Sequence, residues 1–305
     1  MPLAVGPAIS QMRGVMRFAV TLVSPDPQAA DHAAAIVADV VTIAGRVVKA
    51  PSQLGPGAVD LEVESDQRLM LKIDMPVDIC VQPVEGRKKR LLVADMDSTI
   101  IGCECLDELA DFAGLKPQIA AITERAMRGE LEFEAALRER VGMLKGLGLD
   151  ALRRTYDERV RLNPGAQIMV RTMAAHGARC VLVSGGFSYF TSRVADACGF
   201  HDNRANTLID DGRALTGRVG EPILGREAKL AALRSEAASV GAEMSLTLAL
   251  GDGANDLAMI EAAGLGVAYR AKPVVAAQAD AKLDHCDLTA LLYFQGYRAE
   301  EFWQP

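Results

Sequence analysis

A short apolar strand that ends in two carboxylates constrains the fold of this chain more than any other stretch. Residues 91–94 are apolar, as a strand buried on both faces requires, and Asp95, Asp97, Ser98 and Thr99 follow. In open α/β sheets, ligands bind just outside the carboxyl ends of the strands. Two neighbouring carboxylates in a dry site repel each other unless a cation such as a divalent metal offsets their charge. An Asp-rich turn that caps a helix would have a similar sequence, so this stretch alone leaves both interpretations open.

The composition is that of an ordinary globular protein with an acidic balance. The chain has 305 residues, half of them hydrophobic, and a net charge of −7. This length can support a large core and two domains. The negative charge gives no reason to expect nucleic acid or an anionic membrane as a partner. No stretch resembles a signal peptide or a bilayer-spanning segment, so we expect a cytoplasmic protein.

The cysteines and histidines form no metal-binding pattern. Six cysteines and four histidines are scattered along the chain. Cys103 and Cys105 have the wrong spacing for a zinc knuckle, and no histidine lies nearby in the sequence to complete one. We therefore expect reduced, mostly buried thiols and no histidine metal site.

Another apolar run in the second half of the chain ends in a small polar turn. Residues 179–183 lead into a Ser-Gly-Gly turn at 184–186, which leaves backbone N–H groups for an anion. Most turns of this composition bind nothing, so the turn alone is weak support for a site. Lys229, on an amphipathic helix predicted over 225–240, would in isolation be interpreted as a surface lysine.

The loop after the apolar run 246–250 is rich in glycine and carboxylates. Residues 251–256, with the sequence Gly-Asp-Gly-Ala-Asn-Asp, have the outline of a dinucleotide-binding loop. A carboxylate at Asp256 would repel a pyrophosphate, however. The loop instead offers oxygen ligands beside Asp95.

A helical insertion follows the first strand. Residues 102–162 predict four helices, at about 104–113, 117–127, 131–145 and 149–160. In the third of these, Arg140 lies on the apolar face. A guanidinium there needs a partner, because an unpaired buried charge is costly. The residues alone favour an ion pair with Glu104 or Glu124, and a bound carboxylate is the alternative.

The first 85 residues predict a separate small unit. We expect a strand at 17–23, a helix at 26–44, a loop at 51–57 and a strand at 58–64. The pattern resembles the amino-acid-sensing ACT domain, and a generic α+β appendage used for dimer contact fits it about equally well. The basic run at 85–90 is expected to be a solvated linker.

Taken in order, these motifs resemble those of the haloacid dehalogenase superfamily. They are Asp95-Met96-Asp97-Ser98-Thr99, Ser184, Lys229 and Gly251-Asp252-Gly253-Ala254-Asn255-Asp256. Further positions are similar to the phosphoserine phosphatase family within it, namely Glu104, Met127, Phe133, Arg140 and Ser184-Gly185-Gly186-Phe187. The resemblance covers about residues 88–295 and is far weaker before residue 85.

The resemblance implies an α/β fold. Its core would be a Rossmann-like parallel sheet, with a helical-bundle cap inserted after the first strand at about 102–162. Residues 86–305 would form this catalytic domain, and residues 1–85 the small α+β, ACT-like domain for regulation or for a homodimer contact. A hairpin is also predicted over 205–219, around Asp211-Gly212.

The resemblance also implies roles for the site residues. Asp95 would be the nucleophile, and Asp97 the general acid and then the general base. Mg²⁺ would be held by the carboxylates of Asp95 and Asp252 and the backbone carbonyl of Asp97, with Asp256 just outside these ligands. The substrate phosphate would contact Ser184, Gly185 and Lys229. The rest of the substrate would contact Glu104, Met127, Phe133, Arg140 and Asn255.

The implied activity is Mg²⁺-dependent hydrolysis of O-phospho-L-serine to L-serine and phosphate through an aspartyl-phosphate, the last step of serine biosynthesis. The alternative is a phosphatase of the same superfamily for another small phosphate ester, although Glu104 and Arg140 favour a zwitterionic amino acid. A phospho-acceptor signalling module is the alternative of a different class. Asp97 and the insertion argue against it, because such a module has no leaving group to protonate and no cap.

Overall fold

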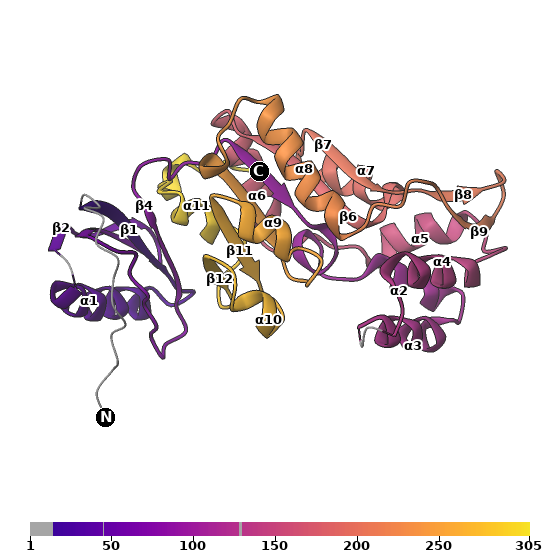
Figure 1. Ribbon diagram of the computed structural model, residues 1–305, viewed down its shortest axis with the longest axis horizontal. Coiled ribbons are helices and arrows are strands. Elements are labelled where there is room, and N and C mark those ends of the chain that lie inside the picture. Colours follow the sequence, from indigo (N-terminus) through magenta and orange to yellow (C-terminus); the bar gives the residue numbers. More distant parts are fainter. Residues whose placement is uncertain (1–14, 45, 128–129) are drawn as a thin grey trace.

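Two β-sheets of different size organise the protein. The computed structural model describes residues 15–44, 46–127 and 130–305. A four-stranded sheet lies near the N-terminus, a six-stranded sheet holds the middle, and helices of an insertion lie at the far end (Figure 1). We call residues 15–83, which contain the smaller sheet, the N-terminal unit.

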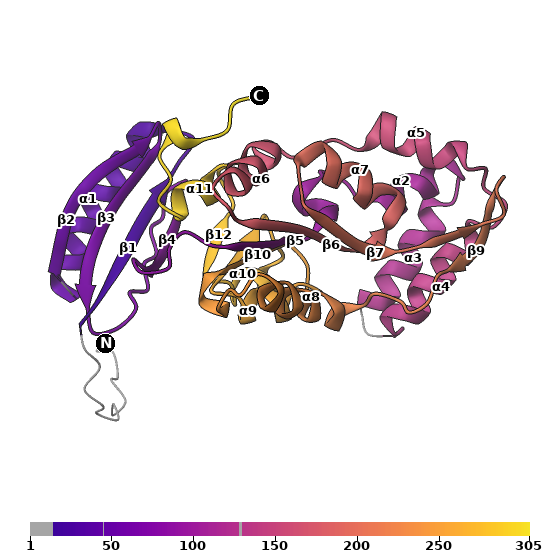
Figure 2. The same ribbon diagram turned by 90° about the horizontal axis from the view of Figure 1, so that it is seen from above.

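The N-terminal unit is an antiparallel sheet covered on one face by one helix. Its elements are β1 (Met16–Val23), α1 (Pro27–Ala44), β2 (Arg46–Gly55), β3 (Ala58–Ser65) and β4 (Asp78–Pro83), with strand order β2-β3-β1-β4. Alternate residues of β1 and β3 point towards α1, and they pack on helix residues such as Ala33, Val37 and Val41. The view from above shows α1 lying along the sheet (Figure 2).

The structure corrects the predicted loop at 51–57. Strand β2 continues to Gly55, and only the turn at 56–57 separates it from β3. The prediction was wrong because Pro51 was taken as a strand breaker. β2 lies at the edge of the sheet, where a residue without an N–H donor is tolerated, and the register shifts between Lys49 and Ser52. The resemblance to ACT domains stays a prediction, as does the domain boundary at residue 85.

The larger sheet is parallel throughout, as predicted. Its strand order is β12 (Ala281–Leu283), β11 (Leu265–Tyr269), β10 (Thr247–Gly251), β5 (Leu91–Ala94), β6 (Arg179–Phe187) and β7 (Asp202–Asn206). All residues of β5, β10 and β11 are buried, which explains their uninterrupted apolar sequences. The first motif therefore follows a strand in the middle of the sheet.

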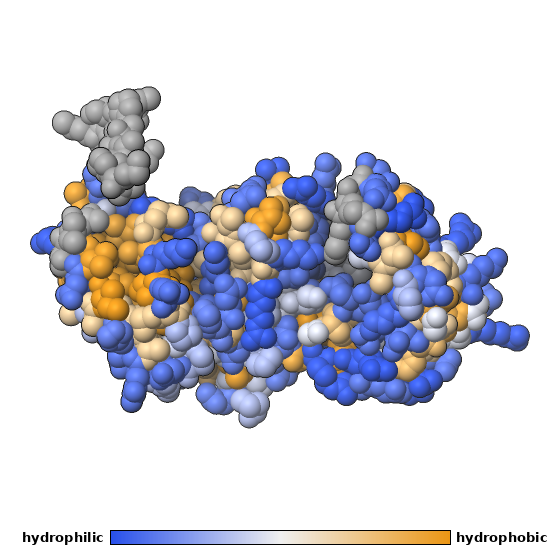
Figure 3. Space-filling model, turned by 90° about the horizontal axis from the view of Figure 1, so that it is seen from below, coloured by the Kyte–Doolittle hydropathy of each residue, from blue (hydrophilic) through white to orange (hydrophobic). Residues whose placement is uncertain are grey.

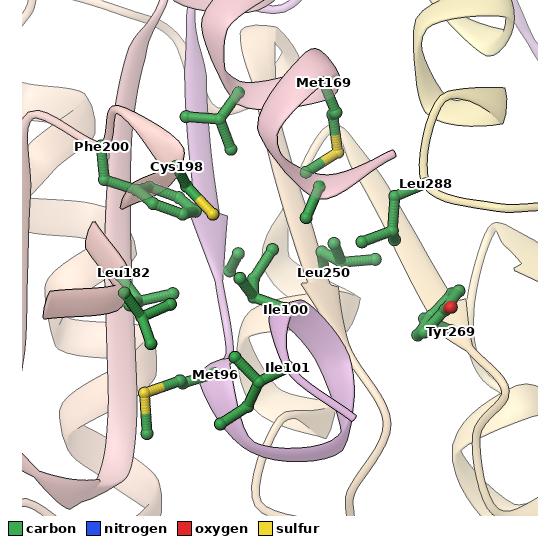
Figure 4. Packing of buried hydrophobic residues seen from close by; sticks show 14 of the residues in the cluster. Met96, Ile100, Ile101, Met169, Leu182, Cys198, Phe200, Leu250, Tyr269 and Leu288 are labelled. Atoms are coloured by element: carbon green, nitrogen blue, oxygen red, sulfur yellow. The ribbon is translucent and has the colours of Figure 1, made fainter. Parts of the chain in front are cut away.

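Helices cover both faces of this sheet (Figure 2). One face carries α6 (Ala166–Ala175), α7 (Ser188–Cys198) and α11 (Ala290–Phe294), and the other carries α8 (Arg226–Ser239), α9 (Leu257–Ala262) and α10 (Pro273–Ala276). On the first face Leu182 of β6 and Leu250 of β10 belong to the same buried cluster as Met169 of α6 and Cys198 of α7 (Figure 4). This two-sided cover buries the strands and leaves their carboxyl ends as the polar edge.

The predicted insertion is present as four helices between β5 and β6. They are α2 (Cys105–Phe112), α3 (Lys116–Met127), α4 (Phe133–Met143) and α5 (Asp150–Arg159). The predicted hairpin is β8 (Leu208–Asp210) with β9 (Leu215–Val219), and it lies against this insertion (Figure 1). The backbone N–H of Gly146 donates to Leu215 O at 2.8 Å, and the N–H of Leu215 donates to Leu147 O at 2.9 Å.

The basic run at 85–90 is solvated only in part, so the prediction of a solvated linker was wrong for Arg87 and Lys89. Arg87 forms an ion pair with Asp60 at 2.5 Å and donates to the carbonyl oxygen of Phe294 at 2.8 Å. The side chain of Lys89 is buried and donates to the carbonyl oxygens of Gly86 and Ser245. Protein atoms thus cover Arg87 and Lys89, whereas Glu85, Lys88 and Arg90 remain exposed.

A second polar contact fixes the N-terminal unit to the larger sheet. The carboxylate of Asp78, at the start of β4, accepts hydrogen bonds from the backbone N–H groups of Asp284, His285 and Cys286, just after β12. Gln82 Nε2 donates to Phe294 O at 2.7 Å. The interface between the N-terminal unit and the larger sheet therefore depends on buried polar groups whose partners lie more than two hundred residues away in sequence.

We expect Arg87→Ala to destabilise the protein strongly. Asp60 is 1% exposed, so the substitution leaves a buried carboxylate without its guanidinium, which typically costs about 3–5 kcal/mol. Urea unfolding followed by circular dichroism measures the change. The matched control is Arg46→Ala, which removes an exposed ion pair with Glu64 and should cost less than about 1 kcal/mol. Equal losses in the two variants would show that the Arg87 pair contributes no more than a surface pair.

Candidate active site

A cavity of about 560 Å³ lies between the carboxyl edge of the larger sheet and the helical insertion. The turn after β5, the end of β6 and the loop after β10 line one side. The insertion lines the other. The residues around the cavity are Asp95, Asp97, Ser98, Glu104, Leu106, Asp107, Thr123, Leu131, Phe133, Leu137, Arg140, Ser184, Gly185, Gly186, Phe187, Asp252, Gly253, Ala254, Asn255 and Lys272.

A wide turn after β5 separates the two carboxylates of the first motif. Residues 96–100 form the turn, which the N–H of Ile101 closes onto Met96 O at 3.0 Å. Met96, Ile100 and Ile101 are fully buried and anchor it in the core (Figure 4). With these side chains in the core, Asp95 and Asp97 line the cavity.

Asp95 and Asp256 share one buried lysine. Lys229 Nζ lies 2.7 Å from Asp95 Oδ1 and 2.6 Å from Asp256 Oδ1, and its side chain is almost completely buried. Burial opposes the charge of Lys229, yet Asp256 and Asp95 together raise its pKa. Burial raises the pKa of Asp95, with Asp256 adding to the shift and Lys229 opposing it. Taken in isolation, the helix pattern favours a surface position for this lysine, and the structure has it buried instead.

Three carboxylates converge at the strand ends. Oxygen atoms of Asp95, Asp252 and Asp256 lie within 4.8 Å of one another. Burial, and then the charge of Asp256, raise the pKa of Asp252 to about 6, although Thr99 Oγ1 donates to its carboxylate at 3.0 Å. Oxygen donors with mutually unfavourable charges are a donor set that suits a hard divalent cation such as Mg²⁺.

Within this cluster, Asp256 is already engaged by protein groups. Besides Lys229, its carboxylate accepts the backbone N–H of Asp252 at 3.2 Å and of Gly253 at 3.0 Å. Its oxygen atoms therefore shape the loop, while those of Asp95 and Asp252 face the cavity. This arrangement fits the predicted place of Asp256 just outside the metal ligands.

The side chain of Asp97 lies outside the carboxylate cluster. Its Oδ1 accepts the backbone N–H of Cys105 at 2.9 Å, and its Oδ2 accepts the hydroxyl of Ser184 at 3.1 Å. Burial, and then the charge of Glu104, raise its pKa to about 6. A carboxyl group with such a pKa can hold a proton near neutral pH.

On the insertion side, Arg140 is half-buried and faces the cavity. Its Nη1 donates to Thr123 Oγ1 and its Nε to Ala136 O, both at 3.2 Å. Among the ion pairs that the structure describes, none joins Arg140 to Glu104. Burial lowers the pKa of Arg140, and Asp107 and Glu104 oppose the shift. The remaining N–H groups of the Arg140 guanidinium can donate to a ligand.

The remaining predicted site residues line the same cavity, except for Met127. Glu104, Phe133, Gly185 and Asn255 line it. Glu104 Oε1 accepts the hydroxyl of Ser98 at 2.7 Å. The ring of Phe133 lies close enough to Gly185 that a Cβ there would be 3.4 Å from it. The side chain of Met127 lies outside the described residues.

Several lining residues were not predicted. Thr123 and Asp107 come from the insertion, and Lys272 follows β11. Thr123 lies 17 residues before its partner Arg140, a separation with no helical periodicity that could have suggested the contact. Lys272 follows β11, which no sequence motif marks, so only the fold brings it to the cavity.

A family model for haloacid dehalogenase-like hydrolases matches residues 92–261, which is more than half of the chain. The chain belongs to this family. It is therefore a hydrolase, and the predicted fold class of its larger sheet is confirmed.

Relatives of this hydrolase include named phosphatases. A phosphoserine phosphatase of Archaeoglobus fulgidus is 44% identical over 218 residues, or 70% of this chain, and the chain spans 63% of that relative's length. A solved structure described as a phospho-aspartyl intermediate analogue of phosphoserine phosphatase is 36% identical, with a TM-score of 0.63 over 68% of this chain and 99% of that one.

A further solved structure matches almost the whole hydrolase. A haloacid dehalogenase family hydrolase from Salmonella enterica serovar Typhi covers 91% of this chain and 98% of its own, with 29% identity and a TM-score of 0.78. The arrangement of the N-terminal unit on the larger sheet is thus found in another member of the family. In residues 15–44, 46–127 and 130–305, no helix has both the length and the apolar composition to cross a bilayer.

Gly186→Ala should disable the site without unfolding the protein. A Cβ at Gly186 would lie 2.7 Å from Asp97 Oδ2 and 3.0 Å from Ser184 Oγ, so it would displace both groups. Misplacement of a reacting group by about 1 Å can cost on the order of 100-fold in rate. Steady-state hydrolysis and thermal unfolding measure the two effects. Gly142→Ala in α4, where a Cβ would make only an ordinary contact of 4.0 Å with Gly217 O, is the control and should keep its activity. Full activity in Gly186→Ala would contradict the assigned geometry.

Proposed function

We propose that this hydrolase releases L-serine and phosphate from O-phospho-L-serine in an Mg²⁺-dependent reaction, as the last step of serine biosynthesis. The observation that carries the proposal is the different placement of Asp95 and Asp97 within one cavity. Asp95 belongs to the carboxylate cluster with Lys229, whereas Asp97 is bound to Ser184 and to the N–H of Cys105. The phosphoserine phosphatases among the relatives support the same activity.

Asp95 acts as the nucleophile in this proposal. Its carboxylate oxygen attacks phosphorus, the bond from phosphorus to the serine oxygen breaks, and an aspartyl-phosphate forms. Lys229, Ser184 and the N–H of Gly185 stabilise the charge on the phosphoryl oxygens. When bound by Asp95, Asp252 and the carbonyl of Asp97, Mg²⁺ supplies further positive charge at the same place.

Asp97 moves the protons of both half-reactions. In the first, it donates its proton to the serine oxygen as that group leaves. In the second, it accepts a proton from the water that attacks the phosphorus of the aspartyl-phosphate, and so returns to its protonated state. Its raised pKa suits a group that must hold and release a proton near neutral pH.

Charged groups on the insertion recognise the amino-acid part of the substrate. Arg140 binds the substrate carboxylate with its remaining guanidinium donors, and Glu104 binds the ammonium group. Met127, Phe133 and Asn255 complete the pocket. In this proposal, helices α2–α5 form a cap that closes on the substrate and excludes water during the first half-reaction.

The N-terminal unit is proposed as an ACT-like regulatory or dimerisation domain, with its boundary at residue 85. Its helix α1 exposes two large apolar side chains, Ile36 and Val40, at 37% and 49%. The space-filling view shows apolar residues gathered on this part of the molecule (Figure 3). A homodimer that packs through this face would cover them.

A phosphate-release assay over several substrates tests the proposal. We expect O-phospho-L-serine to be hydrolysed far faster than a sugar phosphate, because only a phospho-amino acid carries both groups that Arg140 and Glu104 bind. Activity should vanish with a chelator and return with Mg²⁺. Since Ca²⁺ prefers more ligands and longer bonds, it should not restore full turnover. A preference for the sugar phosphate would favour another small phosphate ester, and full activity in chelator would overturn the metal site.

Arg140→Ala should weaken catalysis selectively for phosphoserine. Loss of a buried partner for the substrate carboxylate should cost about 2–5 kcal/mol in kcat/KM. An aryl phosphate has no such carboxylate and should lose much less. Arg138→Ala, on the exposed side of the same helix, is the matched control. Equal losses for both substrates would make Arg140 a structural residue.

Asparagine substitutions of Asp95 and Asp97 should impair different steps of the proposed reaction. Asp95→Asn should form no phosphoenzyme, because an amide is a poor nucleophile. Asp97→Asn should lose about 10²–10⁴-fold in turnover of phosphoserine, whose alkoxide needs a proton to leave. An aryl phosphate has a better leaving group and should still phosphorylate Asp95 in that variant. A burst of phenol with phosphate retained on the protein detects this. Labelled phosphate retained on the Asp95→Asn variant would contradict the assignment of Asp95 as the nucleophile.

A further inference from the structure

Thr123 and Arg140 meet on the insertion side of the cavity. Thr123 belongs to α3 and Arg140 to α4, and both side chains line the cavity. Arg140 Nη1 donates to Thr123 Oγ1 at 3.2 Å. The proposed hydrolysis assigns the substrate carboxylate to Arg140 and gives Thr123 no role. The contact between the two side chains therefore bears on how Arg140 is presented to the substrate.

The hydroxyl of Thr123 is engaged both as a donor and as an acceptor. It donates to Ile119 O, one turn earlier in α3, at 3.1 Å. The same oxygen atom accepts the N–H of Arg140. A hydroxyl has a single proton to donate. Thr123 can therefore hold Arg140 but has no donor left for a substrate carboxylate, which makes it a positioning residue and not a substrate ligand.

A second contact holds the same guanidinium by a different nitrogen atom. Arg140 Nε donates to Ala136 O, one turn earlier in α4, at 3.2 Å. Among the hydrogen bonds of the described residues, none uses Nη2 of Arg140. A guanidinium binds a carboxylate best through two parallel N–H groups. Because Nε is engaged, the pair of nitrogen atoms that remains for this purpose is Nη1 and Nη2.

We propose that Thr123 fixes the Arg140 guanidinium so that its Nη1 and Nη2 groups meet the carboxylate of an amino-acid phosphate ester. Without this contact, the guanidinium would keep only its hydrogen bond to Ala136, which belongs to its own helix. The end of the long side chain could then rotate, and substrate binding would have to order it again. The inference deepens the proposed function, because it rests on Arg140 as the carboxylate ligand.

The acidic surroundings give the restraint on Arg140 a chemical reason. Glu104 and Asp107 line the same cavity. An unrestrained guanidinium in a half-buried site could pair with one of these carboxylates and would then be lost to the substrate. A contact with a neutral hydroxyl restrains the guanidinium without neutralising it. The positive charge of Arg140 thus stays available for the substrate carboxylate.

Thr123→Val in the full-length protein tests the proposal, because valine has nearly the shape of threonine but no hydroxyl. We expect kcat/KM for O-phospho-L-serine to fall about tenfold, as for loss of a hydrogen bond to a charged group, mostly through a higher KM. An aryl phosphate has no carboxylate and should be hydrolysed as by the parent. Thr123→Ser restores the hydroxyl and should recover most of the loss.

Thr155→Val is the matched control. Thr155 lies in α5 of the same insertion, and its buried hydroxyl has no hydrogen-bond partner among the described residues. This variant should hydrolyse both substrates like the parent. A double-mutant cycle then links Thr123 to Arg140. In an Arg140→Ala background, Thr123→Val should have no further effect on phosphoserine, because Thr123 acts through Arg140.

Three results would overturn the role of Thr123 while the parent hydrolyses phosphoserine. Equal losses for phosphoserine and the aryl phosphate would make Thr123 a structural residue of the insertion. A Thr123→Val variant as active on phosphoserine as the parent would show that the contact does not matter. An undiminished loss in the Arg140→Ala background would show that Thr123 acts independently of Arg140. A parent that hydrolyses no phosphoserine would instead refute the proposed function, and the inference with it.

Discussion

The buried ammonium group of Lys229 is the interaction on which the active-site end of the larger sheet depends. Without it, Asp95 and Asp256 would face each other in a site from which water is excluded, and such like-charged pairs are strongly destabilised. Asp256 in turn holds the backbone of the loop after β10, which places Asp252. One lysine thus joins α8 to the ends of two neighbouring strands and keeps three carboxylates at a common point.

The same region shows how one turn can give two neighbouring carboxylates different chemistry. Asp95 and Asp97 are separated by a single residue, yet one contacts a lysine and the other contacts a serine hydroxyl and a backbone N–H. The buried side chain of Met96 between them and the wide turn that follows separate their surroundings. A regular strand would place both on the same face of the sheet, in a similar environment.

Much of this arrangement could be predicted from the sequence, because the motifs follow uninterrupted apolar strands. Buried parallel strands end at one edge, so Asp95, Ser184 and Asp252 were expected together. Contacts that depend on tertiary packing could not be predicted. Local sequence does not show that α8 turns Lys229 inward.

The contacts that were not predicted all depend on tertiary packing, which local sequence does not show. Arg87 lies 27 residues from Asp60, and nothing in the basic run around it distinguishes a buried guanidinium from a solvated one. Pro51 is tolerated in β2 only because that strand lies at a sheet edge, and edge position is a property of the whole sheet.

The contact between β4 and β12 has a consequence for the chain as a whole. Each is an edge strand of its own sheet, and the two lie beside each other, with Asp78 occupying the N–H groups just after β12. Exposed strand edges are templates for pairing with other molecules. By lying beside each other, β4 and β12 each cover one edge of the other's sheet, so separating the two sheets would expose two strand edges to pairing with other molecules.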